Sequence, residues 1–252
     1  MDWQESRFFC DYFRDFQVQP SFKNKVDQLP IQSLKALEQS LELLIPANDR
    51  KLNGAFFTPD YIVDFIIHEV KPGCRDQCLD PSAGSGAFLL GLADYFKKQY
   101  GKSIRQTVRE NLTGMDILPY NVQRAKVILA LFALQNGEWL EESDFRIFCG
   151  DSLRTDWANY YEVIVGNPPY VKFQDLDIAD REALYRDWET VNNGTFNLYF
   201  AFFELGYKLL SADGRLGYIT PNNYFTSLAG ERLRNFFTKN QCVSRIIDFN
   251  DR

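Results

Sequence analysis

Short apolar runs alternate with segments of helical periodicity over most of this chain. Each run, such as QCLD or EVIVGN, is only a few residues long and is followed by a longer segment with apolar residues three and four apart. This alternation is typical of α/β proteins, in which crossover helices join the parallel strands of one sheet. We therefore expect a doubly wound parallel sheet whose strands lie at 77–80, 111–117, 145–151, 162–167, 214–221 and 243–249.

The first part of the chain has a different pattern. Four leucines between residues 34 and 44 share one helical face, and Pro30 and Pro46 bracket them. We therefore expect an N-terminal helical extension over residues 1–50, followed by one larger domain over residues 51–252. The sequence assigns no role to the extension.

The segment FFTPDYIVDFIIHEVK precedes the first expected strand and also has helical periodicity. We expect Thr58 to be the N-cap of this helix and Pro59 to occupy the first helical position. The Pro59-Asp60 pair and the EVK triplet at 69–71 imitate the PD…ExK pattern of nucleases. That site needs its ExK part on a strand beside the first acid, so the helical periodicity argues against a nuclease.

The charge and the cysteine content exclude several classes of protein. A net charge of −6 and a pI of about 5.0 argue against a non-specific nucleic-acid coat, but not against an enzyme whose basic module lies elsewhere. The 5 cysteines and 1 histidine form no zinc motif, so we expect no metal site and reduced thiols in the cytoplasm. The N-terminus lacks the apolar core of a signal peptide, and the stretch VILALFAL is too short to span a bilayer.

The segment DPSAGSGAF follows the first expected strand, at the edge where α/β sheets bind ligands. Gly84 and Gly86 allow positive φ angles and a close approach of the backbone to a ligand. Leu89 stands where a dinucleotide fingerprint has its third glycine, so that fingerprint fails. The Asp80 carboxylate would repel a pyrophosphate but suits a ligand with an ammonium group. The alternative is an ordinary strand-to-helix turn.

Acids also end the second and third expected strands. Asp116 is placed to accept both hydroxyls of a ribose, and the adjacent Ile117 could pack on a purine. Asp151, in CGDSL, could accept a hydrogen bond from an exocyclic amine. The alternatives are a solvated acid at Asp116 and an N-cap or turn aspartate at Asp151.

The segment NPPY, residues 167–170, follows the fourth expected strand. Proline cannot donate to a strand ladder, so this segment is expected to be a rigid loop. Three acids, a glycine loop and this motif at one sheet edge together suit an adenosine that carries an amino acid. That ligand is S-adenosylmethionine.

The motifs FFTP, DPSAGSG, GMDI, CGDSL, NPPY, TFNLYFAFFELGYKLL, GRLGYITPNNYF and ERLRNFF occur here in one order. In that order the chain resembles the gamma class of DNA adenine methyltransferases from about residue 52 to residue 250. It is most similar to the methylase part of type IIG restriction–modification enzymes and also to type I modification subunits. The resemblance implies a Rossmann-like, S-adenosylmethionine-dependent methyltransferase fold and a catalytic domain over residues 51–252.

The resemblance also implies a role for each matching residue. The FFTP segment matches the part that closes over the methionine end of the cofactor, and Asp80 with the following loop matches the part that holds it. Asp116 matches the ribose ligand, Ile117 the residue on the adenine, and Asp151 the acceptor of the adenine amine. The implied catalytic residues are Asn167, Pro168, Pro169 and Tyr170, and the implied cofactor-binding residues are Phe56, Phe57, Thr58, Asp80, Ala83, Gly84, Gly86, Asp116, Ile117, Asp151 and Ser152.

The expected reaction moves a methyl group to the exocyclic amine of an adenine flipped out of double-stranded DNA. The Asn167 side-chain oxygen and the Pro168 carbonyl would accept the two N–H groups of that amine. These bonds strengthen as positive charge grows on the nitrogen, and therefore favour the transition state. Tyr170 could stack on the base.

Other functions remain open from the sequence alone. Protein-glutamine and ribosomal-RNA guanine methyltransferases also use NPPY-type loops, and a non-catalytic DNA-binding subunit could keep the same fold. In the family, a seventh antiparallel strand and a target-recognition domain follow the sixth strand. We expect both to be absent from this chain, which would then depend on a separate specificity protein or on the rest of a longer enzyme.

Overall fold

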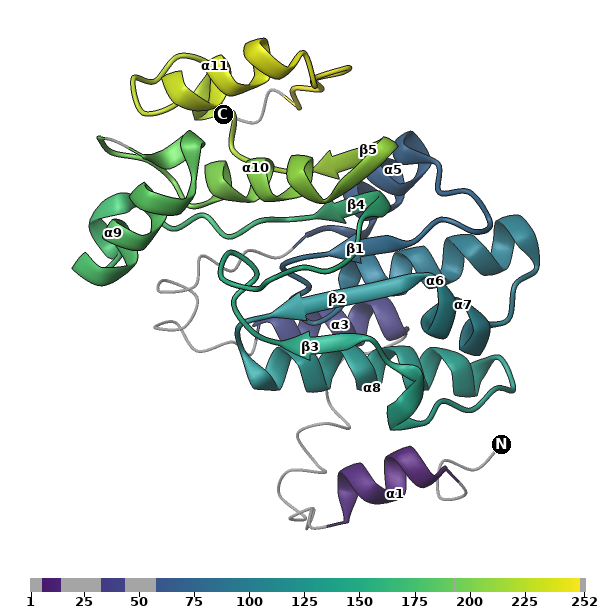
Figure 1. The fold of residues 1–252 in the computed structure, drawn as a ribbon. Helices are drawn as coiled ribbons and strands as arrows, with labels where there is room; N and C mark the ends of the chain where they lie inside the picture. The colour runs from purple at the N-terminus through teal and green to yellow at the C-terminus, as the bar shows by residue number, and fades with distance from the viewer. Residues whose placement is uncertain (1–5, 15–32, 44–57, 193, 250–252) are drawn as a thin grey trace.

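The computed structural model of this chain describes residues 6–14, 33–43, 58–192 and 194–249 (Figure 1). Within these ranges, five strands form one parallel sheet with the order β3-β2-β1-β4-β5. The chain runs outward from β1 in one direction and then restarts beside it at β4, and ligands bind at such reversals of strand order. The strands are β1 (Cys78–Asp80), β2 (Leu112–Asp116), β3 (Ile147–Cys149), β4 (Tyr161–Gly166) and β5 (Leu210–Tyr218).

Helices cover both faces of the sheet, because side chains of successive strand residues point to opposite faces. Cys78 and Val163 belong to one hydrophobic core, and their neighbours Leu79 and Ile164 belong to the other. The doubly wound architecture is therefore confirmed. The first core is covered by α5 (Asp60–Val70), α6 (Ala87–Tyr100), α7 (Ile104–Glu110) and α8 (Pro119–Gln135), and the second by α9 (Ile178–Asp187), α10 (Tyr199–Leu209) and α11 (Glu231–Asn240).

Short 3₁₀ segments complete the described structure at η2 (Glu142–Asp144), η3 (Phe173–Asp175), η4 (Glu189–Val191) and η5 (Asn222–Phe225). None of the helices described is long and apolar enough to cross a membrane.

The N-terminal helices pack against the domain. The helix predicted from the leucine spacing is α3 (Leu34–Leu43), and a second helix, α1, spans Arg7–Phe13. Lys35 of α3 pairs with Asp64 of α5 at 3.2 Å, and Arg124 of α8 donates to the Leu41 carbonyl at 3.1 Å. These contacts hold α3 behind the sheet, beside α8 (Figure 1).

The predicted sixth strand at 243–249 is wrong. This segment is irregular and exposed throughout, with Ile246 56% exposed. It contacts α5, through an Arg245–Glu69 ion pair and an edge-on ring contact between Phe65 and Phe249. An apolar run becomes a strand only when a neighbouring strand accepts and donates its backbone hydrogen bonds, and none of the described strands pairs with this one.

The predicted N-cap at Thr58 is also wrong. Helix α5 begins at Asp60, and Pro59 is its N-cap, without a side-chain capping bond. The hydroxyl of Thr58 instead accepts a hydrogen bond from the side chain of Asn167, in the loop after β4. Glu69 lies on the same helix as Asp60, which agrees with the argument against a nuclease site.

Candidate active site

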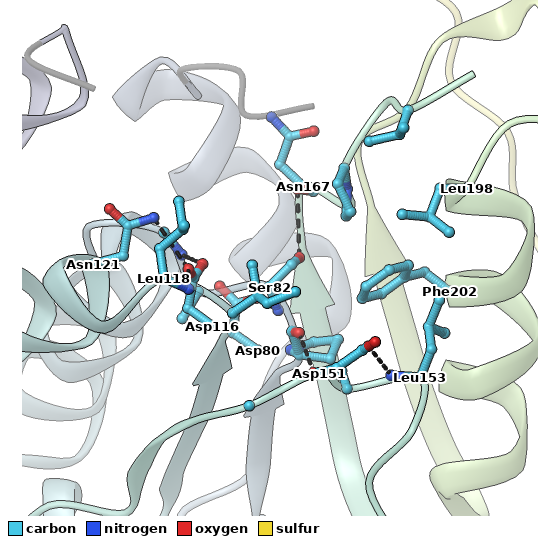
Figure 2. Close-up of a pocket in the computed structure, with 18 of the residues that line it drawn as sticks. Asp80, Ser82, Asp116, Leu118, Asn121, Asp151, Leu153, Asn167, Leu198 and Phe202 are labelled. Carbon is cyan, nitrogen blue, oxygen red and sulfur yellow. Dashed lines mark hydrogen bonds between the residues drawn. The ribbon is translucent and has the colours of Figure 1, made fainter. Parts of the chain in front are cut away.

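One cavity lies at the carboxyl ends of the strands, beside the point where the strand order reverses (Figure 2). It brings together most of the predicted site residues, although they come from segments far apart in the sequence. The predicted residues that line it are Thr58, Asp80, Ala83, Gly84, Asp116, Ile117, Asp151, Ser152, Asn167 and Pro169. Phe56 and Phe57 lie outside the described residues.

Asp80 ends β1 and is only 1% exposed. Its Oδ1 atom accepts a hydrogen bond from the Ser82 N–H at 3.0 Å. Burial raises the pKa of the Asp80 carboxyl to about 8, and the nearby Asp116 adds to the rise. The hydrogen bond from the Ser82 N–H lowers this pKa and so opposes part of the effect of burial. An adjacent ammonium group would favour the ionised form of this carboxyl and so oppose the effect of burial.

The glycine loop connects β1 to α6. Gly84 has a φ of 53°, and its N–H donates to Asp116 Oδ2 at 2.8 Å. Gly86 has a φ of 98°, and a Cβ there would lie 3.0 Å from the side chain of Ala125. Gly86 does not line the cavity. Its lack of a side chain instead lets the start of α6 pack closely on Ala125 of α8. The buried Ala83 donates its N–H to the Met115 carbonyl at 2.9 Å.

Asp116 ends β2 and is held by three donors, namely the Gly84 N–H, the Leu118 N–H at 2.9 Å and the Asn121 side-chain amide at 3.1 Å. Burial raises the pKa of its carboxyl, and these three bonds oppose the rise. Figure 2 shows the Leu118 and Asn121 bonds on one side of the cavity. Ile117 is 52% exposed at the cavity rim.

Asp151 follows β3 and accepts a hydrogen bond from the Leu153 N–H at 2.9 Å. Its other oxygen pairs with Arg154 at 3.3 Å, and Arg154 also pairs with Asp180 of α9. The Ser152 hydroxyl donates to the Pro81 carbonyl at 2.5 Å. Ser152 therefore ties the loop after β3 to the loop after β1, while Asp151 faces the cavity.

The Asn167–Tyr170 loop follows β4. The Asn167 Nδ2 atom donates to Thr58 Oγ1 at 3.0 Å, and its Oδ1 atom accepts from the Tyr170 hydroxyl. The same hydroxyl lies 3.1 Å from the Ile219 carbonyl. Pro169 lines the cavity, whereas Pro168 is buried and Tyr170 packs edge-on against Tyr199 at 5.9 Å.

Several residues that the sequence analysis did not single out also line the cavity. Leu198, the N-cap of α10, and Phe202 of α10 lie across from Asp116 (Figure 2). They belong to TFNLYFAFFELGYKLL, a motif recognised above but given no residue-level role. Glu38 reaches the cavity from α3 and is 2% exposed, and Asn121 reaches it from the first turn of α8. No local pattern marks Glu38, since its place depends on how α3 packs.

Comparison with known families adds independent evidence. The family of Eco57I restriction-modification methylases matches residues 110–252. The chain is 35% identical to the type II restriction enzyme and methyltransferase RM.Eco57I of Escherichia coli, covering 76% of this chain and 25% of that protein. It is 26% identical to the type II methyltransferase M.HincII of Haemophilus influenzae, covering 79% of this chain and 34% of that protein. The chain thus spans about a third or less of the length of these relatives.

Solved structures with the same fold include a DrdV–DNA complex, with a TM-score of 0.64 and 20% identity over 89% of this chain and 25% of that one. They also include a protein described as a class I S-adenosylmethionine-dependent methyltransferase from Listeria monocytogenes. Its TM-score is 0.58, with 15% identity over 88% of this chain and 65% of that one. At these identities the likeness shows the fold, which is that of the methyltransferases.

Proposed function

We propose that this chain, which belongs to the family of Eco57I restriction-modification methylases, is the catalytic part of a site-specific DNA adenine methyltransferase. The observation that carries the proposal is the cavity in which Asp80, Asp116 and Asp151 meet the Asn167 loop. The matching relatives are type II methyltransferases, which favours DNA over a protein or ribosomal-RNA substrate.

S-adenosylmethionine fits the chemistry of this cavity. Asp80 suits the ammonium group of its methionine part, and Asp116 suits its ribose. At the other end, Asp151 can accept a hydrogen bond from the adenine amine. Leu198 and Phe202 offer an apolar surface for the purine ring, opposite Ile117 on the rim. When bound, the cofactor supplies an electrophilic methyl group on a sulfonium.

Asn167 prepares the target amine for attack. An amide oxygen has two lone pairs, and the Tyr170 hydroxyl contacts Asn167 Oδ1 through one of them. The second lone pair can accept an N–H of the adenine amine, and the Pro168 carbonyl can accept the other N–H. Because these acceptors are fixed before reaction, they stabilise the positive charge that grows on the nitrogen without reorganisation.

The prolines keep this arrangement rigid. Each proline fixes its own φ angle and has no N–H that could compete for an acceptor. The residue before a proline is restricted to extended conformations, which applies to Asn167. We therefore expect the Asn167–Tyr170 loop to lose little conformational entropy when the base binds.

The substrate must be a base outside the helical stack, because the loop lies at the edge of a cavity and not on a flat surface. The chain is acidic overall, so we infer that much of the phosphate contact and the sequence recognition come from a target-recognition domain or specificity subunit. A cytoplasmic location is part of the same proposal.

Calorimetric titration of the folded chain with S-adenosylmethionine tests the cofactor assignment. We expect binding, and at least tenfold weaker binding by Asp116→Ala, since a buried charged partner is lost. The exposed acid Asp213 provides the control, because Asp213→Ala should leave the affinity unchanged. Absence of any binding heat from folded protein would sink the assignment.

Mass spectrometry of nucleosides tests the reaction. DNA incubated with methyl-labelled cofactor and with the chain together with its target-recognition domain or specificity subunit should yield labelled N6-methyladenine. Label found only in cytosine, or in protein or RNA substrates offered in parallel, would overturn the adenine assignment.

A further inference from the structure

Helix α9 buries little of its own surface. Leu184 is the one buried residue among its 10, whereas α5, a helix of similar length, buries 5 of 11. Figure 1 shows α9 beyond the carboxyl ends of the strands, apart from the helices behind the sheet. So short a helix is marginal in water by itself, and packing of one face normally stabilises it. The stability of α9 therefore depends on what its inner face contacts.

The inner face of α9 lines the cavity. The residues of α9 that line it are Asp180, Ala183, Leu184 and Asp187. Their spacing of i, i+3, i+4 and i+7 is that of one helical face. This face is turned toward space that a ligand can fill, and a ligand there would cover it as a hydrophobic core covers the inner face of other helices.

Arg154 shows which part of the cavity α9 adjoins. Its Nε atom lies 3.3 Å from Asp151 Oδ2, and its Nη2 atom contacts Oδ1 of Asp180, in the first turn of α9. Asp151 is the proposed acceptor of the cofactor's adenine amine. The first turn of α9 is therefore joined, through one arginine, to the group that the purine would meet.

The apolar side chains indicate the same part of the cavity. Leu184 belongs to the second hydrophobic core together with Phe202, and Leu153 and Leu198 pack against this core. Figure 2 shows Leu153, Leu198 and Phe202 on one side of the cavity, opposite Leu118. Leu198 and Phe202 form the surface proposed above for the purine ring. Leu184 extends the apolar cluster to which that surface belongs.

We propose that α9 is part of the purine subsite, in which Ala183 and Leu184 contact the purine of the bound cofactor. This inference rests on the proposed cofactor. The purine in turn completes the packing of α9. Such coupling is reciprocal, because a ligand that stabilises the helix is bound more tightly by the same free energy. Cofactor binding should therefore protect α9 from local unfolding.

Hydrogen exchange of the backbone amides, measured by mass spectrometry, tests this proposal on the wild-type chain. S-adenosylhomocysteine and adenosine both carry the purine, whereas S-ribosylhomocysteine carries the ribose and the amino acid without it. At saturating concentrations the first two should slow exchange in α9 by about tenfold or more, and the third should leave it unchanged. Equal protection by all three ligands, or no protection by S-adenosylhomocysteine, would overturn the proposal.

The substitution Ala183→Leu tests the contact itself. The longer side chain would extend from the cavity-lining face into the space proposed for the purine. In calorimetry, binding of S-adenosylhomocysteine and of adenosine should weaken by about tenfold or more, because the leucine and the purine compete for this space. Binding of S-ribosylhomocysteine should stay within about twofold of the wild type.

The matched control is Ala179→Leu, the same change on the same helix, at an exposed position that does not line the cavity. This variant should bind all three ligands like the wild type. If Ala183→Leu bound them like Ala179→Leu, or lost affinity for all three equally, Ala183 would not face the purine and the proposal would fail. Thermal unfolding establishes that both variants are folded.

The same measurements separate a failure of this inference from a failure of the cofactor assignment. If the folded wild-type chain bound none of the three ligands, the cofactor assignment would fail together with the inference. If S-adenosylhomocysteine bound and protected the glycine loop before α6, but exchange in α9 did not change, the inference alone would fail.

Discussion

The side-chain amide of Asn167 donates a hydrogen bond of 3.0 Å to the hydroxyl of Thr58, which lies 109 positions earlier in the chain. Thr58 is 6% exposed and lines the same cavity. The bond joins the segment before α5 to the loop after β4. It orients the amide nitrogen toward Thr58, so the amide oxygen is left for other partners, among them the Tyr170 hydroxyl.

Thr58→Val should slow methyl transfer, because valine keeps the shape of threonine but cannot accept the Asn167 bond. We expect a fall of about tenfold at saturating cofactor, the equivalent of one hydrogen bond. The measurement is single-turnover transfer of a labelled methyl group to DNA with a mismatched adenine, so that base flipping costs little.

Thr58→Ser is the matched control, since it restores the hydroxyl and should stay within about twofold of the wild type. If Thr58→Val instead weakened cofactor binding and left the saturated rate unchanged, Thr58 would act on the cofactor and not through Asn167.

Asn167→Ala should abolish detectable transfer while leaving cofactor affinity near that of the wild type. The variant loses the proposed acceptor for the adenine amine, and removal of one such preorganised group typically costs about 10²–10³ in rate. Rate and affinity are measured separately, by labelled transfer and by calorimetry. Full activity in the variant would refute the catalytic assignment of the loop.

Gly166→Ala should destabilise the fold. A Cβ at this last residue of β4 would lie 2.9 Å from Asp80 Oδ1 and 3.5 Å from both Ser82 Oγ and the Tyr218 ring. Since buried Asp80 has little room to move, we expect a loss of about 1–3 kcal/mol in the free energy of unfolding. Urea denaturation measures it. Gly150→Ala is the control, because its Cβ would be no closer than 3.5 Å to any neighbour.

Asp80→Asn should flatten the dependence of stability on pH. The wild-type carboxyl has a pKa near 3.8 when exposed and about 8 in the fold, because burial disfavours its charge. Between these values the folded state binds more protons than the unfolded state, so wild-type stability falls as pH rises and then levels off above about pH 8.

The asparagine does not titrate, yet its side-chain oxygen can still accept the Ser82 bond. The stability of Asp80→Asn relative to the wild type should therefore increase from pH 5 to pH 8. Urea denaturation of the ligand-free chain measures this difference. A constant difference across this range would show that the Asp80 carboxyl is ionised in the fold.

Local chemistry is enough to predict most of the architecture. The alternation of short apolar runs and helical periodicity depends only on neighbouring residues, and five of the expected strands are present with the helices between them. The acids and NPPY directly follow these strands, and parallel strands end at one sheet edge. That geometry explains why the order of residues along the chain suffices to expect the Asp80, Asp116, Asp151 and Asn167 side chains around one cavity.

The remaining features depend on contacts between distant segments. The 243–249 run has strand-like residues, but pairing requires a neighbour, and here the segment lies against α5. Thr58 has the sequence context of a helix cap, yet its hydroxyl meets Asn167 across the fold. The acceptor positions left on Asp116 can be counted only when its donors, including Gly84 and Asn121, are in place. Hydrogen bonds are short and directional, so packing, and not sequence order, sets which groups they join.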